Sequence, residues 1–212
     1  MNVKASFYDV FAYTIPGGVT LFIILHILKE FNIFDFFQNL KDSSFLILVA
    51  FGGLSHVIGF LITPITYFFV KSYRSKEKIH SIAYKEVINR NPNLNDFINP
   101  ADWAIWLAKI KQENIEVASG IDQFLAYSLM ARGVSFGLTL SFILIITYTL
   151  TEKFDTLYLI FLPLIVLFIF VSVIQAKKFR KGFYILIFET IISTKPPFTI
   201  SNEPKSKLTK QA

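Results

Sequence analysis

The chain has 212 residues, of which 53% are hydrophobic, 17% are aromatic and only 17% are charged, and its formal net charge is +6. A soluble domain ordinarily carries about 25% charged residues, so this composition argues against a soluble globular protein. Because the sequence has no Cys, disulfides, thiol nucleophiles, Cys-zinc sites and iron–sulfur clusters are excluded.

Four uncharged, strongly apolar segments occupy residues 11–28, 45–70, 134–150 and 157–174. Each is close to the ~20 residues that a helix needs to cross ~30 Å of hydrocarbon. Lipid offers no partner to backbone N–H and C=O groups, so such spans are helical. The sequence therefore predicts an all-α integral membrane protein with four transmembrane helices. The first segment is expected to be a retained span rather than a cleavable signal, since it is long and contains Pro16-Gly17-Gly18.

These spans divide the chain into four parts. Residues 1–70 are predicted to hold an interfacial N-terminal helix and the first transmembrane hairpin, with a kink where Pro16 removes a helix hydrogen bond. Residues 71–132 are predicted to form a helical cytosolic segment between spans two and three, and residues 133–181 the second hairpin. Residues 182–212 combine an apolar interfacial stretch with a basic tail that is expected to be disordered.

Basic residues are distributed unevenly between the two sides of the predicted membrane. With four spans, both termini lie on the same side as residues 71–132, and only Lys29, Lys41 and Lys153 fall in the two opposite loops. The positive-inside rule therefore places both termini in the cytoplasm. The excess positive charge is expected to face anionic lipid headgroups, and direct binding of nucleic acid is not expected.

One face of the second span is rich in small and polar residues at spacings of three and four. It comprises Gly52, Ser55, His56, Gly59, Thr63 and Thr66. Small residues let helices approach closely in lipid, so we expect this face to lie inside the bundle or at a subunit contact. The alternative is the wall of a water-lined pore. His56, like His26 in the first span, is expected to be a neutral packing residue.

The segment between spans two and three is predicted to contain two short helices before a longer one. The helix of the second span is expected to continue from Lys71 toward Asn89, and Asn99-Pro100 is expected to cap the next helix. That next helix carries Trp103 and Trp106, the only Trp residues of the chain. They are expected to lie on the headgroup layer or to pack under the cytosolic segment; the alternative is a groove that binds a partner.

The sequence Ser119-Gly120-Ile121-Asp122 resembles a capping box before a helix that runs unbroken into the third span. In that span Gly133, Gly137 and Ser141 recur every four residues, which predicts a second close-packing or pore-lining face. The fourth span is expected to face lipid and to end at a basic cluster that contacts headgroups. This cluster comprises Lys177, Lys178, Arg180 and Lys181.

Residues 182–192 form an apolar stretch that is too short to span a membrane. It must lie on the bilayer, dock on residues 71–132 or bind another chain, so Phe183 and Ile187 are candidate interface residues.

Motifs of the common enzyme classes are absent from the sequence. It has no Walker motif, GxSxG, HExxH or pair of carboxylates at an enzymatic spacing. We therefore expect no enzymatic activity, no catalytic residue, no cofactor and no metal site. The leading hypothesis is an oligomeric membrane subunit that presents a cytosolic platform to a soluble partner protein. The alternative is a channel or a membrane-permeabilising effector.

The N-terminal pattern Phe7-Tyr8-Asp9, followed by Tyr13-Thr14-Ile15-Pro16-Gly17, and the four-span plan together resemble small bacterial membrane proteins of anti-phage defence operons. The Kiwa membrane subunit belongs to this broad type. The resemblance implies a homo-oligomer in the bacterial inner membrane that senses perturbation by a phage and acts through a soluble cytosolic partner. It assigns a role to no individual residue.

Overall fold

The computed structural model describes residues 8, 10–30, 44–71, 78–90, 99–151 and 156–193, and in these ranges all regular structure is helical. The elements in chain order are η1 (Val10–Thr14), α2 (Ile15–Glu30), α3 (Ser44–Lys71), α4 (Ile79–Arg90), η3 (Pro100–Asp102), α5 (Trp103–Glu113), α6 (Ile115–Thr151) and α7 (Thr156–Ser193). The all-α expectation is confirmed for this part of the chain. Residues 194–212, which include the predicted basic tail, lie outside the described residues.

Four helices are long and apolar enough to cross a membrane. These candidate spans are Val10–Lys29, Ile47–Tyr67, Ile115–Thr147 and Phe161–Ser193. They match the four segments predicted from the sequence. The last two extend well beyond the apolar segments 134–150 and 157–174, because each belongs to a helix that continues into more polar sequence.

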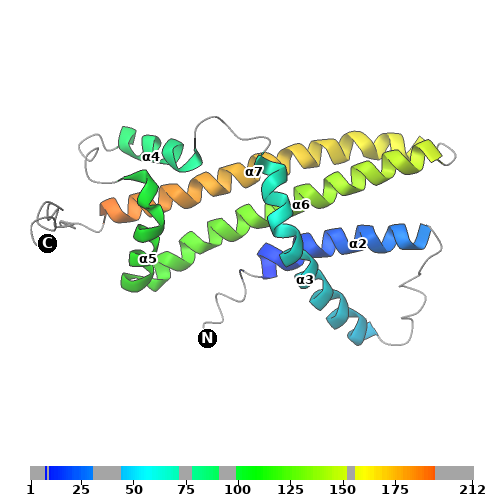
Figure 1. Ribbon diagram of the computed structural model, residues 1–212, viewed down its shortest axis with the longest axis horizontal. Coiled ribbons are helices and arrows are strands. Elements are labelled where there is room, and N and C mark those ends of the chain that lie inside the picture. The colour runs from blue at the N-terminus through cyan, green and yellow to red at the C-terminus, as the bar shows by residue number, and fades with distance from the viewer. Residues whose placement is uncertain are drawn as a thin grey trace, which may run out of the picture.

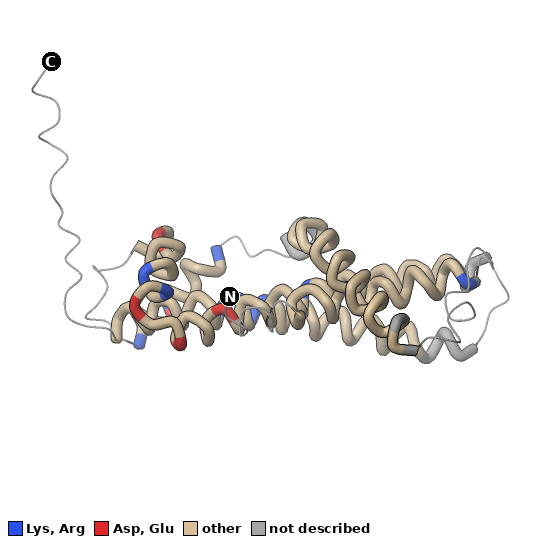
Figure 2. The backbone as a smooth tube through the Cα atoms, turned by 90° about the horizontal axis from the view of Figure 1, so that it is seen from below, with Lys and Arg blue, Asp and Glu red and all other residues tan. Residues whose placement is uncertain are grey.

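Helices α6 and α7 form a long antiparallel pair to which the other elements attach (Figure 1). They contain 37 and 38 residues, so each is about 55 Å long at 1.5 Å per residue. Helices α4 and α5 lie at the end of the pair where α6 begins and α7 ends, and α2 lies beside the other half of α6 (Figure 1). Most charged residues of the described chain gather around α4, α5 and the adjoining ends of α6 and α7 (Figure 2).

The N-terminal rod, residues 10–30, changes from a π-helical turn to an α-helix immediately before Pro16. A proline ring crowds the carbonyl one α-turn earlier and has no N–H to donate, and a wider turn relieves both problems. The predicted irregularity at Pro16 is thus a local widening within a continuous rod. Residues 10–15 belong to the same rod as the rest of the first candidate span and do not form a separate interfacial helix.

Helix α7 does not end at the basic cluster Lys177–Lys181, as predicted, but continues to Ser193. Lys and Arg are good helix formers, so the cluster interrupts the hydropathy and not the helix. The apolar residues beyond it become the centre of a compact hydrophobic core, the platform core, which joins α7 to α4, α5 and α6. The platform core comprises Ala83, Val87, Trp106, Ile110, Ala118, Ile121, Phe183, Tyr184, Ile187 and Phe188.

The two predicted helix starts have different outcomes. Asn99 caps the following helical turn as expected, and its side-chain oxygen accepts a hydrogen bond of 3.0 Å from the N–H of Ala101. The predicted capping box at Ser119 is wrong, because α6 begins four residues earlier. There the side-chain oxygen of Asn114 accepts hydrogen bonds from the N–H groups of Glu116 and Val117. This cap is available because Asn114 itself has an extended backbone.

The helix expected to run from Lys71 toward Asn89 is also divided. Helix α3 ends at Lys71, Lys78 is not helical, and α4 begins at Ile79. The separation lets α4 pack against α7 instead of projecting along the axis of α3.

Candidate functional site

The N-terminal rod crosses α3 at two glycines, with almost no space between the backbones. An ideal Cβ placed on Gly17 would lie 1.7 Å from the carbonyl oxygen of Ser55, and one placed on Gly59 would lie 1.8 Å from the carbonyl oxygen of Tyr13. Any side chain larger than hydrogen would therefore force the helices apart. Small residues permit this kind of close approach between helices in lipid.

The opposite side of the same rod rests on two glycines of α6. A Cβ on Gly133 would lie 2.5 Å from the Cβ of Pro16, and a Cβ on Gly137 would lie 3.0 Å from Cγ1 of Val19. The predicted small-residue face of the third span thus receives the N-terminal rod, which lies between α3 and α6. The remaining member of that face, Ser141, donates a 3.2 Å hydrogen bond to the carbonyl oxygen of Gly137 on its own helix.

The predicted small-residue face of α3 divides into an inner and an outer part. Ser55, Gly59 and Thr66 are buried. Thr63 is half-buried, and its hydroxyl donates to the carbonyl oxygen of Gly59 at 2.8 Å. Gly52 belongs to the outer part, because a Cβ there would meet nothing within 4 Å.

His56 lies at the edge of this face and is exposed, with Nδ1 3.1 Å from the hydroxyl of Thr14. The hydroxyl of Thr66 donates to the carbonyl oxygen of Thr63 at 2.8 Å. Ser55 Oγ is buried and has no hydrogen-bond partner among the described residues. These contacts favour packing over a water-lined path along α3, since the two Thr hydroxyls are satisfied by their own helix.

The candidate interface residues Phe183 and Ile187 are 1% and 0% exposed, inside the platform core. Of the three alternatives for residues 182–192, the structure places them on the segment 71–132. Trp106 is buried as well, and the Trp103 ring lies edge-on to the ring of Tyr184, with centroids 5.3 Å apart. These four side chains therefore hold the chain together and do not form an open groove. Their burial shows that these side chains pack within the chain instead of lining a partner-binding groove, a distinction that their spacing in the sequence could not make.

Ion pairs fasten the short helices to the long pair. Glu86 of α4 accepts hydrogen bonds from Lys181 of α7 and from Arg90, which also pairs with Glu189 of α7 at 2.9 Å. The hydrogen bond from Lys181, followed by the positive charges of Lys181 and Arg90, lowers the pKa of the Glu86 carboxyl below its usual value. Lys181, predicted to contact headgroups, is thus engaged within the chain. Lys178 is exposed.

The outward face of α5 is apolar although it lies on the most polar part of the molecule. Ala101 precedes it, and Ala104, Ile105 and Ala108 follow at helical spacing; all four are exposed. The Ile105 side chain is 68% exposed. An exposed apolar face bordered by charged residues is typical of an interaction surface. We call these four residues the α5 outer face.

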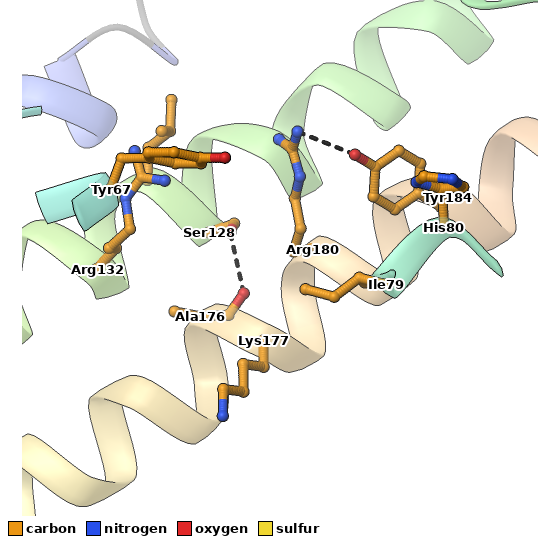
Figure 3. Close-up of a pocket in the computed structure, with 10 residues that line it drawn as sticks. Tyr67, Ile79, His80, Ser128, Arg132, Ala176, Lys177, Arg180 and Tyr184 are labelled. Atoms are coloured by element: carbon orange, nitrogen blue, oxygen red, sulfur yellow. Dashed lines mark hydrogen bonds between the residues drawn. The ribbon is translucent and has the colours of Figure 1, made fainter. Parts of the chain in front are cut away.

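A cavity of about 340 Å³ lies where α3 ends and α4 begins, against α6 and α7. Its lining includes Tyr67, His80, Arg132, Lys177, Arg180 and Tyr184 (Figure 3). Below we call it the basic cavity. A hydrogen bond of 2.9 Å from the Ser128 hydroxyl to the carbonyl oxygen of Ala176 fixes the distance between α6 and α7 along its wall.

Both guanidinium groups of the basic cavity are held in place. Arg132 Nε donates to the Thr66 hydroxyl at 3.0 Å. Arg180 donates to the Tyr184 hydroxyl at 3.1 Å, and its guanidinium carbon lies 5.0 Å from the Phe183 ring centroid. Among the residues that the structure describes, no carboxylate forms an ion pair with either Arg. Arg132 was not among the predicted site residues; its position at the boundary of the third apolar segment was the only available signal.

No three His, Asp or Glu side chains lie close enough together to hold a metal ion in the described part of the chain. No family model, curated protein or solved structure matches this sequence or its fold. What the chain does must therefore be inferred from its residues and their geometry.

Proposed function

We propose that this chain is a homo-oligomeric, multi-pass subunit of the bacterial inner membrane that presents its α5 outer face, held by the platform core, to a soluble cytosolic protein. The observation that carries the proposal is the length of α6 and α7. Each is about 55 Å long and a bilayer's hydrocarbon is ~30 Å thick, so about 25 Å of the pair projects beyond the membrane. Helices α4 and α5 are fastened to that projecting end.

The distribution of charge supports this placement and its orientation. Lys177, Lys178 and Lys181 lie in the half of the fourth candidate span, Phe161–Ser193, that adjoins the platform. At the opposite end of the candidate spans, Lys29 of α2 is the only Lys or Arg among the described residues. A positively charged platform end favours the cytoplasmic side. Both termini then lie in the cytoplasm with the platform.

The outer part of α3 supports self-association. A Cβ placed on Gly52 or on the adjacent Gly53 would meet nothing within 4 Å among the described residues. Exposed apolar residues such as Leu48 and Phe60 continue the same helix. In lipid, a small-residue patch that no helix of its own chain covers favours contact with a second copy.

The continuity of α6 and α7 also suggests how such a subunit would act. A change in the packing of the spans would be transmitted to the platform, because the two long helices have no break between the membrane and the platform core. A rigid connection of this kind suits a sensor whose output is the position of a bound partner. The role in anti-phage defence that the N-terminal resemblance implies is part of this proposal.

Capture of the partner from solubilised membranes tests the proposal. Tagged wild-type chain is expected to co-purify a soluble protein in a fixed ratio. Replacement of Ile105 by Ser is expected to abolish this capture. The control Ile115→Ser, which changes a comparably exposed Ile outside the α5 outer face, is expected to retain it. If Ile105→Ser and wild type capture the same proteins in the same amounts, the α5 outer face is not the partner site. Protection of cells against phage infection, compared between the same variants, tests the role in defence.

The channel alternative predicts a different measurement. Liposomes that contain the purified chain would release ions, and the Thr63→Val variant would change that flux. The platform proposal predicts no flux above that of empty liposomes.

A further inference from the structure

We propose that the basic cavity binds the phosphate of an anionic phospholipid, with Arg132 and Arg180 as the groups that hold it. The inference rests on the proposed membrane placement, since that placement puts the cavity at the cytoplasmic headgroup level. The inference assigns a specific ligand to a chain whose proposed function is to hold a partner protein.

The charges that line the basic cavity are not balanced. Elsewhere at the platform end, several cations have carboxylate partners: Lys181 pairs with Glu86, and Arg90 with Glu189. In the basic cavity two guanidinium groups line the same half-open space, and no described carboxylate pairs with them. Like charges repel more strongly when they are partly removed from water. A bound anion would relieve that repulsion.

The guanidinium groups of Arg132 and Arg180 are held in position by other side chains of the same chain. Arg132 is fixed by Thr66 through Nε, and Arg180 is fixed by the Tyr184 hydroxyl through one Nη. A guanidinium has five N–H donors, so each side chain keeps donors that these bonds do not use. In Figure 3, Arg180 is seen between the Arg132–Tyr67 pair and the His80–Tyr184 pair. A planar guanidinium group can donate two parallel hydrogen bonds to two oxygens of the same phosphate.

The position of the cavity favours a lipid over a soluble phosphate compound as its ligand. Tyr67, at the end of the second candidate span, lines the cavity, so the cavity lies at a boundary between apolar and polar surface. On α7, the exposed apolar side chains of Phe170 and Ile174 precede the lining residue Lys177 at helical spacing, toward the span side. They offer a surface for acyl chains beside a headgroup in the cavity. Basic pockets between membrane helices on the cytoplasmic side commonly bind such headgroups.

The experiment compares lipids of different charge on the full-length chain in neutral detergent. Native mass spectrometry is used to measure retention of phosphatidylglycerol and phosphatidylcholine, and thermal unfolding is followed with each lipid and with inorganic phosphate. Wild type is expected to retain phosphatidylglycerol preferentially and to be stabilised by it, but not by inorganic phosphate. Arg132→Gln and Arg180→Gln are expected to lower the affinity for phosphatidylglycerol by about tenfold or more, the effect of losing one charge-assisted hydrogen bond.

The matched control is Lys78→Gln. It removes the same charge next to the cavity-lining residue Ile79, but the Lys78 side chain is exposed and does not line the cavity. It is expected to bind phosphatidylglycerol as wild type does. An equal loss for Lys78→Gln would mean diffuse attraction to the surface and would overturn the inference.

Two further outcomes would also overturn it. Equal retention of the two lipids by wild type would do so without any variant, so the test holds even if an Arg variant does not fold. Equal stabilisation by inorganic phosphate would assign the cavity to a soluble phosphate compound instead of a lipid. Partner capture by the same variants separates this inference from the platform proposal, because Arg132→Gln is expected to lose the lipid while the α5 outer face remains intact.

Discussion

Gly59 lies directly against the backbone of Tyr13, at a distance that leaves no room for a methyl group between them. Gly17 faces Ser55 in the same way one turn further along the N-terminal rod. The rod is therefore locked onto α3 by backbone contact, and it rests on α6 through Gly133 on its other side. Three of the four candidate spans, those of α2, α3 and α6, meet at this crossing.

Replacement of Gly59 by Ala is expected to destabilise the fold by at least about 1–3 kcal/mol, the usual cost of overpacking, because a backbone carbonyl cannot move aside as a side chain can. The measurement is the unfolding midpoint in neutral detergent. Gly120→Ala is the matched control, since a Cβ there meets nothing within 4 Å. Equal midpoints for Gly59→Ala and wild type would show that the rod and α3 do not approach as closely as described.

Replacement of Gly52 by Leu is expected to reduce self-association without unfolding the single chain. The added side chain has open space within its own chain, but it would keep a second copy from approaching α3. Size-exclusion chromatography with light scattering gives the mass of the protein in the detergent micelle. The change Gly120→Leu, at an equally open glycine in α6, is expected to leave that mass unchanged. A Gly52→Leu variant with the mass of wild type would place the subunit contact elsewhere.

Truncation of Phe188 to Ala is expected to destabilise the platform by about 3–5 kcal/mol, because the side chain is fully buried and the change leaves a cavity. Partner capture should fall together with the unfolding midpoint. Val171→Ala on the exposed apolar surface of α7 is the control and should change neither quantity. If Phe188→Ala were as stable as wild type, residues beyond the basic cluster would not form the core described.

The ion pairs of Glu86 predict a dependence on pH. The pKa of this carboxyl is lowered in the folded protein, chiefly by its hydrogen bond from Lys181. Its contribution to stability is therefore fully present above the ordinary value of 4.5 and is lost as the pH falls through the lower, folded-state pKa. The unfolding midpoint of wild type should fall between pH 6 and about pH 3 by more than that of Glu86→Gln.

Trp fluorescence reports this transition, because Trp103 and Trp106 lie in or against the platform core. Glu113→Gln, which changes an exposed carboxylate at the end of α5, should keep the pH dependence of wild type. Parallel curves for Glu86→Gln and wild type would contradict the prediction.

The sequence was sufficient for the four helices that are long and apolar enough to cross a membrane and for the helix cap at Asn99, because apolar length and local capping chemistry are properties of neighbouring residues. It misplaced the end of α7, since the basic cluster changes hydropathy without changing helix propensity. The small residues of α3 and α6 were visible as faces, but nothing in one sequence indicated that Pro16 and Gly17 fill the space between them. Arg132 and Arg180 are 48 positions apart, so only the pairing of α6 with α7 brings them to one cavity.

The central claim is that α6 and α7 carry α4 and α5 out of the membrane on the cytoplasmic side. Because the chain has no Cys, single replacements give an unambiguous label: Ala108→Cys on the α5 outer face and Lys29→Cys at the opposite end of α2. Both positions are exposed. In intact spheroplasts, a membrane-impermeant maleimide is expected to label Lys29→Cys at once and Ala108→Cys only after the membrane is permeabilised. Labelling of Ala108→Cys in intact spheroplasts would contradict the account.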